Sequence, residues 1–176
     1  MFPFFRTGLE LWLHRNKPMG IFDTHVSHHT IRLWDMDIFA ELNNGRTLTV
    51  FDIGRVTLAL RTGLIALLRR EKWGLTLAGN SVRYRRRVRA FQRVETKVRL
   101  IGWDDRFLYI EHAMFRKGQC TSHVLVRGAI TDGAGLVTMD RVLSSYGYDG
   151  PSPELPGWVQ AWVAAEDKRP WPPFED

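Results

Sequence analysis

WDMDIFAELNNGRTLTVFDIGR, residues 34–55, is the stretch that decides the fold. It opens with two acids at alternate positions, Asp35 and Asp37, where an alternating run typical of a strand ends. A short irregular segment then leads to Asn43 and Asn44, where an apolar pattern typical of a helix begins. The start of a helix carries unpaired backbone N–H groups and a partial positive charge. The stretch therefore predicts a carboxylate beside a helix N-terminus that can bind an anion or a developing oxyanion.

A long apolar helix is predicted from about Gly45 to Arg70, because no proline interrupts the pattern. Its apolar residues spread round most of its circumference, so the helix must be buried on nearly all sides. At a rise of ~1.5 Å per residue it would be about 40 Å long, enough to cross a whole sheet. A first strand is predicted ahead of it, over residues 23–34.

Strands are predicted for most of the chain after Trp73, because the hydropathy pattern changes to a period of two. The predicted strands begin at about residue 75 and continue through residues 94–100, 107–115 and 120–131. Short turns between consecutive strands predict an antiparallel meander. One strand before the helix and four after it predict an α+β domain whose sheet wraps the helix.

Three segments of the opening stretch match a known family pattern, in this order: Asp35-Met36-Asp37, Leu42-Asn43-Asn44 and Asp52-Ile53-Gly54-Arg55. In this respect the chain resembles the hotdog-fold acyl-CoA thioesterases, in particular the branch that includes 4-hydroxybenzoyl-CoA thioesterase. Two positions differ, since Ala40 and Glu41 stand where many relatives carry Gly and His. The resemblance implies a hotdog fold, in which an antiparallel sheet of about five to six strands wraps a long central helix. A C-terminal helical extension would follow.

The resemblance also implies roles for individual residues in hydrolysing an acyl thioester. Asp37 would be the nucleophile or the general base for water, and the backbone N–H of Asn44 would hold the oxyanion. Asn43 would bind substrate, or would only cap the helix. Asp35 would orient Asp37 or face solvent.

An arginine-rich run, RYRRRVR, occupies residues 83–89. If the run is extended, every second arginine projects from the same face. A row of guanidinium groups suits phosphate, because each can bind two oxygens at once. Under the resemblance Arg85 and Arg87 would bind the phosphates of coenzyme A; a subunit interface or a solvated face are the alternatives.

The charge and the cysteine content bear on the kind of ligand and on the cellular compartment, but they do not identify the function. The net charge of +6 and the pI of about 9.9 favour polyanions in general, including nucleic acid, anionic lipid and coenzyme A. The single cysteine, Cys120, excludes an intramolecular disulfide, so the expected location is the reducing cytoplasm. Cys120 itself is expected to be a small buried residue in the middle of a strand. No G-x-S-x-G motif is present, which disfavours a serine nucleophile.

No metal and no cofactor other than the coenzyme A of the substrate are expected. His25, His28 and His29 lie on the predicted first strand, but the second ligand cluster that zinc sites usually need is missing from the sequence. These histidines are therefore expected to face solvent or to be hydrogen-bonded.

The whole chain, residues 1–176, is expected to form one domain with a core over about 23–135. The N-terminal segment, residues 1–22, has apolar side chains but no run approaching the ~20 residues that span a bilayer. It is expected to touch a membrane as a short helix, or to pack on the domain or on a partner subunit. The C-terminal extension, residues 136–176, is expected to carry helices near 140–145 and 155–166.

Two other classes of function stay open. One is a non-catalytic acyl-CoA or acyl-carrier binding protein of the same fold, favoured by the missing Gly-His pair. The other is a nucleic-acid-binding module, suggested by the arginine run. The predicted strands of this chain lack the neighbouring exposed aromatic residues on which nucleic-acid bases stack, so nucleic acid is not expected as a partner. The resemblance implies an acyl-CoA or acyl-carrier protein substrate and a homodimer or homotetramer whose sites are built from two chains.

Overall fold

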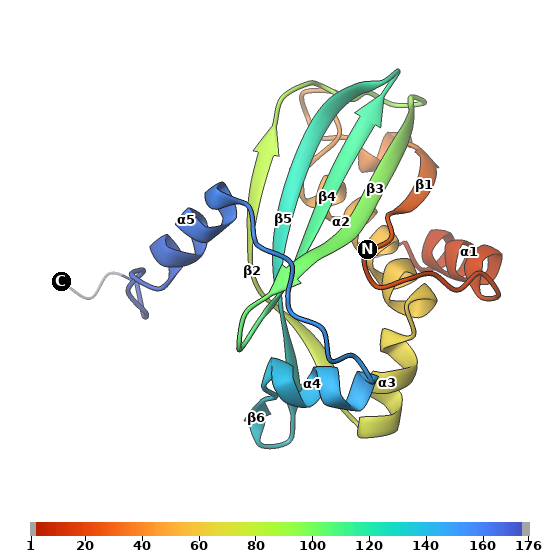
Figure 1. The fold of residues 1–176 in the computed structure, drawn as a ribbon. Coiled ribbons are helices and arrows are strands. Elements are labelled where there is room, and N and C mark those ends of the chain that lie inside the picture. Colours follow the sequence, from red (N-terminus) through yellow and green to blue (C-terminus); the bar gives the residue numbers. More distant parts are fainter. Residues whose placement is uncertain (1–2, 174–176) are drawn as a thin grey trace.

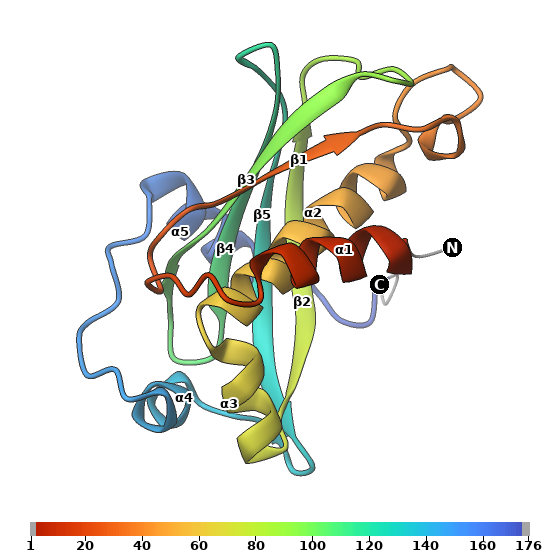
Figure 2. The same cartoon turned by 90° about the vertical axis from the view of Figure 1, so that its right-hand side faces the viewer.

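A curled antiparallel sheet holds the central helices against its concave face (Figure 1 and Figure 2). The structure, a computed structural model, describes residues 3–173. The elements, in chain order, are α1 (Phe4–His14), β1 (His25–Thr30), η1 (Leu33–Asp35), α2 (Asn44–Arg61), α3 (Leu64–Glu71), β2 (Gly74–Tyr84), β3 (Arg93–Trp103), β4 (Leu108–Arg116), β5 (Gln119–Asp132), β6 (Gly135–Leu136), α4 (Met139–Tyr146) and α5 (Gly157–Glu166).

The strands pair in the order β1-β3-β4-β5-β2, with the short β6 attached to β5, and every pairing is antiparallel. Three of the four strands in the predicted meander, β3, β4 and β5, do follow one another in the sheet. The first, β2, does not pair with β3 as a meander would require, but pairs with β5 at the far edge, and β1 forms the other edge. The predicted fold class, α+β with an antiparallel sheet wrapped round a helix, is confirmed.

The central helix is not the single helix predicted from Gly45 to Arg70. It stops at Arg61, and α3 begins only at Leu64. Between them Gly63 adopts a φ of 80°, the left-handed conformation that glycine tolerates without a side-chain clash. The apolar pattern continues across this break, so periodicity alone could not reveal it.

The first strand is also shorter than the predicted span of residues 23–34. β1 ends at Thr30, and the chain then turns through the short 3₁₀ helix η1. The backbone N–H of Ile31 donates to Gln92 O and its carbonyl accepts from Phe91 N, so it is held by the loop before β3. The alternation persists to Trp34, but its last residues are not in the sheet.

The core lies between α2 and the concave face of the sheet, and a glycine sets how closely they approach. A Cβ added to Gly54 would lie 2.8 Å from Cγ2 of Val98 on β3, nearer than real Cβ contacts allow. Phe51 is buried beside His112 of β4, with 5.3 Å between ring centroids. Burial holds the pKa of His112 well below its ordinary value, so its ring packs in the core in the neutral form.

The convex face of the sheet carries a second, smaller apolar cluster beneath α5. Val159 of α5 is buried against outward-facing strand residues such as Leu125 and Tyr109. The helix begins at Gly157, two residues after the predicted start, because Pro156 serves as its N-cap. Within the C-terminal extension, α5 thus lies on the side of the sheet opposite the central helix (Figure 1), whereas α4 packs on the helix side.

Helix α1 packs with its polar side inward and its apolar side outward. Glu10 is buried, 3.5 Å from His25 Nε2, whereas Phe5 is 83% and Trp12 59% exposed. The segment does pack on the domain, as one of the alternatives predicted, but through the face opposite to that of an ordinary amphipathic helix. Among the described residues, no helix combines the length and the apolar character needed to cross a membrane.

The histidines of β1 differ in environment. His25 is fully buried, and His29 is buried with Nε2 2.9 Å from the hydroxyl of Ser27. Burial lowers the pKa of His29 to about 4. His28 is half exposed and lies 3.4 Å from Glu95. Within residues 3–173 no three or more His, Cys, Asp or Glu side chains are grouped so as to hold a metal ion.

Cys120 is exposed, contrary to the prediction of a buried residue in mid-strand. It is the second residue of β5, directly after the turn at Lys117 and Gly118, both of which have positive φ. That tight turn places Cys120 at the end of the sheet, where its side chain is exposed.

Candidate functional site

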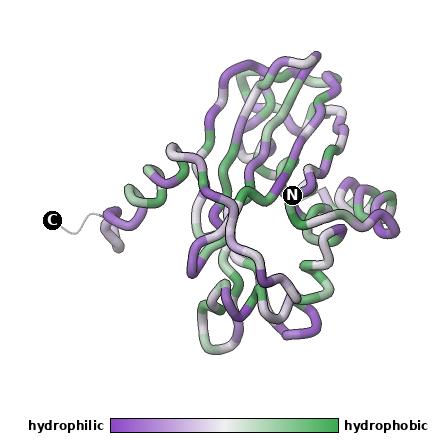
Figure 3. Tube along the Cα trace, in the orientation of Figure 1, coloured by the Kyte–Doolittle hydropathy of each residue, from purple (hydrophilic) through white to green (hydrophobic). Residues whose placement is uncertain are grey.

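A polar pocket of about 190 Å³ opens at the N-terminus of α2, beside the end of β2. Its wall consists of Glu41, Leu42, Asn44, Thr47, Tyr84, Arg85, Arg86, Arg87, Val88 and Ser122. Three cations and one carboxylate thus line it, which favours an anionic ligand. The loop that follows β2 is strongly hydrophilic, in contrast to the strand cores (Figure 3). Of the predicted site residues, Asn44, Arg85 and Arg87 meet here.

The N-terminal amides of α2 are unequally satisfied. The side-chain Oδ1 of Asn43 accepts from the N–H groups of Gly45 (2.9 Å) and Arg46 (3.3 Å), and its carbonyl accepts from Thr47 N–H (2.8 Å). The N–H of Asn44 has no acceptor within residues 3–173. Asn43 is thus the N-cap and is not on the pocket wall. The one amide left for a ligand is that of Asn44, the amide that the sequence pointed to.

Most of the arginine run is not in an extended strand, so the condition for its alternation between two faces is not met. β2 ends at Tyr84, and the N–H groups of Arg85 and Arg86 both donate to the carbonyl of Thr121, at 2.8 and 3.1 Å. Sharing one acceptor bends the chain out of the strand, so the arginines no longer alternate between two faces. As a result Arg85, Arg86 and Arg87 all line the pocket.

Asp37 lies next to this pocket but does not line it. Its Oδ1 accepts hydrogen bonds from the N–H groups of Phe39 (2.9 Å) and Glu41 (3.2 Å), and its own N–H donates to Glu41 O (2.8 Å). The loop is closed by a β-bridge between Met36 and Leu42. Within one chain the structure therefore does not bring the Asp37 carboxylate and the Asn44 amide into the same cavity.

Asp35 neither orients Asp37 nor faces solvent, so both of its predicted roles are wrong. It is 3% exposed, and Oδ2 accepts from Arg6 Nη2 and from the N–H of Arg32, each at 2.9 Å. Its carbonyl accepts from Asn43 N–H at 2.9 Å. Asp35 thus ties α1 and η1 to the start of α2. The partner that buries it, Arg6, lies too far along the chain for a local pattern to reveal.

Sequence reasoning did not select several residues of the pocket wall. Glu41 is a wall residue, and its Oε1 lies 2.9 Å from Nε of Arg87. Tyr84 donates to the carbonyl of Asn44 at 3.4 Å, and burial raises the pKa of its phenol. The signal for Glu41 was present, because it occupies the position where relatives often have a histidine. Nothing local distinguished Thr47 or Ser122.

The fold and this helix-terminus pocket define a thioesterase-like protein. The profile of the thioesterase-like superfamily matches residues 31–163, and the chain belongs to that superfamily. This match confirms the resemblance to hotdog thioesterases. It begins at Ile31 and so includes the whole stretch from Trp34 to Arg55.

Two curated relatives share more of the sequence than the solved structures do. Protein THEM6 of Drosophila melanogaster is 29% identical over 146 residues, covering 81% of this chain and 74% of that protein. Protein THEM6 of Xenopus laevis is 30% identical over 135 residues, covering 76% of this chain but only 64% of the frog protein.

Solved structures share the fold at low sequence identity. The probable thioesterase YbaW from Escherichia coli superposes with a TM-score of 0.65 at 12% identity, covering 69% of this chain and 95% of that one. The hypothetical protein SAV2348 from Staphylococcus aureus, solved in complex with CoA, superposes with a TM-score of 0.62 at 10% identity and covers 81% of this chain and 96% of its own. At these identities the likeness concerns the fold.

Proposed function

We propose that this protein hydrolyses an acyl thioester, of coenzyme A or of an acyl-carrier protein, to the free acid and the thiol. The observation that carries the proposal is the unpaired Asn44 N–H on the wall of a pocket that also holds three arginines. Membership of the thioesterase-like superfamily and the CoA complex of a protein with the same fold support it.

In the proposed reaction, the thioester carbonyl oxygen accepts a hydrogen bond from Asn44 N–H, which stabilises the negative charge that develops there. Arg85 and Arg87 bind phosphate groups of the substrate. Asp37 attacks the carbonyl carbon to form a mixed anhydride that water then hydrolyses, or it removes a proton from water that attacks directly. In both routes the C–S bond breaks, and the thiolate leaves and takes up a proton.

A second copy of the chain would explain why Asp37 lies outside the pocket of a single chain. Among the described residues, β2 is an edge strand that pairs only with β5. Its other edge can therefore pair with a strand of a second chain. We propose a homodimer or homotetramer in which the partner supplies the remaining wall. Light scattering should then give a multiple of 20.4 kDa. A fully active monomer would contradict this part of the proposal.

The exposed side of α1 fits the peripheral membrane contact that the sequence suggested. Phe5 and Trp12 face outward, and the guanidinium of Arg15 lies 4.6 Å from the centre of the Trp12 ring, an aromatic–cation pairing suited to a lipid interface. We expect sedimentation with anionic vesicles, and less of it for a Phe5→Ser/Trp12→Ser variant. Equal sedimentation of both proteins would argue against the contact.

The test of the proposed function is release of free thiol from a panel of acyl-CoA thioesters, read beside the melting temperature. Thiol release supports hydrolysis. A higher melting temperature with acyl-CoA but no thiol would favour the non-catalytic binding protein instead. Neither response, together with oligonucleotide binding that weakens steeply with salt, would favour the nucleic-acid-binding module.

A further inference from the structure

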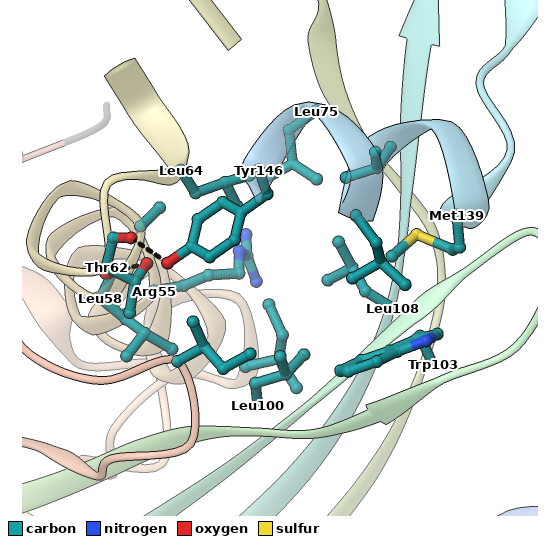
Figure 4. Close-up of a pocket in the computed structure, with 15 residues that line it drawn as sticks. Arg55, Leu58, Thr62, Leu64, Leu75, Leu100, Trp103, Leu108, Met139 and Tyr146 are labelled. Carbon is teal, nitrogen blue, oxygen red and sulfur yellow. Dashed lines mark hydrogen bonds between the residues drawn. The ribbon is translucent and has the colours of Figure 1, made fainter. Parts of the chain in front are cut away.

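A second cavity lies at the other end of α2 from Asn44, under α4 (Figure 4). Its walls come from α2 (Leu58), from strands β3 and β4 (Leu100, Leu108) and from α4 (Met139, Val142). Leu58 is 14 positions beyond Asn44, which is about 21 Å along a helix at ~1.5 Å per residue. This cavity is therefore separate from the arginine pocket.

The wall is mostly apolar, and the hydroxyls on it are hydrogen-bonded to the protein. The hydroxyl of Tyr146 donates to Thr62 O, and the hydroxyl of Thr62 donates to Leu58 O at 2.9 Å, as Figure 4 shows. Arg55 points its guanidinium to Asp52, with 2.6 Å between Nη2 and Oδ1. A cavity with a predominantly apolar wall does not hold water well, and such cavities bind apolar molecules. The cavity therefore favours hydrocarbon.

The size of the cavity favours a narrow chain over a ring. It offers about 80 Å³ to the centre of a water-sized sphere. That is roughly half of the ~150 Å³ cavity that accommodates benzene in an engineered protein. The cavity therefore suits the end of a linear aliphatic chain better than an aromatic group.

A groove adjoins this cavity. The groove, of about 270 Å³, shares the wall residues Arg55, Ala59, Leu75 and Ile110 with the cavity. It lies between the helices and strands β2 and β5, and the arginine pocket lies further along the same seam, with wall residues from α2, β2 and β5. The arginine pocket and the groove share no wall residue, so a chain bound at both would have to cross the stretch of α2 between Thr47 and Arg55.

We propose that the groove and the cavity under α4 bind a straight aliphatic acyl chain, with its distal end in the cavity, so that long-chain fatty acyl thioesters are the substrates. The assignment of this chain to a thioester rests on the proposed function. The hydrocarbon site itself does not, because a free fatty acid carries the same chain.

Ala59 offers a direct test, because it lines both the groove and the cavity and a larger side chain would fill their junction. Calorimetric titration with laurate should show binding to the unchanged protein and at least a tenfold weaker affinity for Ala59→Phe. Ala66→Phe, the same change at an exposed position of α3, is the matched control and should bind laurate as the unchanged protein does.

The acyl-CoA panel separates this inference from the proposed function. Ala59→Phe should lose kcat/KM for palmitoyl-CoA while keeping that for acetyl-CoA. If Ala59→Phe does not fold, Leu143→Phe narrows the same cavity from α4. Laurate binding without thiol release would contradict the proposed hydrolysis but support the hydrocarbon site. No laurate binding, or equal binding by the filled variants and the Ala66→Phe control, would overturn the site.

Discussion

The Asp37→Asn variant is expected to lose about 10²–10⁴ in kcat for acyl thioester hydrolysis, the usual contribution of a positioned general base. The amide keeps an oxygen where Oδ1 accepts the N–H groups of Phe39 and Glu41, so the loop should hold its conformation. What disappears is the negative charge that makes the group a nucleophile or a base. The rate of thiol release measures the loss, and an unchanged melting temperature shows that the fold is kept.

Glu41→Gln is the matched control, because Glu41 is the neighbouring carboxylate and does line the pocket. Its side chain is held by Arg87 at 2.9 Å, so we expect it to order the arginines and to affect KM more than kcat. A large loss of kcat in Glu41→Gln together with a nearly unchanged rate in Asp37→Asn would contradict the proposal. That result would transfer the chemical role to Glu41.

Asn44→Pro is expected to lower kcat by about 10²–10³, the usual effect of removing one oxyanion donor. Proline lacks a backbone N–H but is well tolerated at the first position of a helix. Asn44 occupies that position, and Asn43 before it has φ −58° and ψ 142°, the extended conformation that a following proline favours. The substitution therefore deletes the candidate donor with little cost to the helix.

Asn44→Ala separates the amide from the side chain, since alanine keeps the N–H and loses only the carboxamide. Thiol release by this variant should stay close to that of the unchanged protein. If Asn44→Pro folds and retains full activity, the oxyanion is not held by this amide. If Asn44→Ala is as slow as Asn44→Pro, the side chain is the important group.

The sheet and the central helix could be predicted because their signals are local. Alternation with a period of two marked each strand of the meander, and an apolar run without proline marked α2. The boundaries were less certain where a single backbone angle decides them. Gly63 ends α2 within a continuous apolar pattern. The carbonyl of Thr121 accepts from the N–H groups of both Arg85 and Arg86, and β2 therefore ends at Tyr84, inside the arginine run.

The sequence by itself determined the fold class, the helix N-terminus at Asn43 and Asn44, and the concentration of arginines after β2, because these depend on residues close together in the chain. Only the tertiary structure decided which carboxylates are free for chemistry. Asp35 is neutralised by Arg6, 29 positions away, and Glu41 reaches the pocket while Asp37 turns to the amides of its own loop. Burial and ion pairing join distant segments, and no local pattern encodes that pairing.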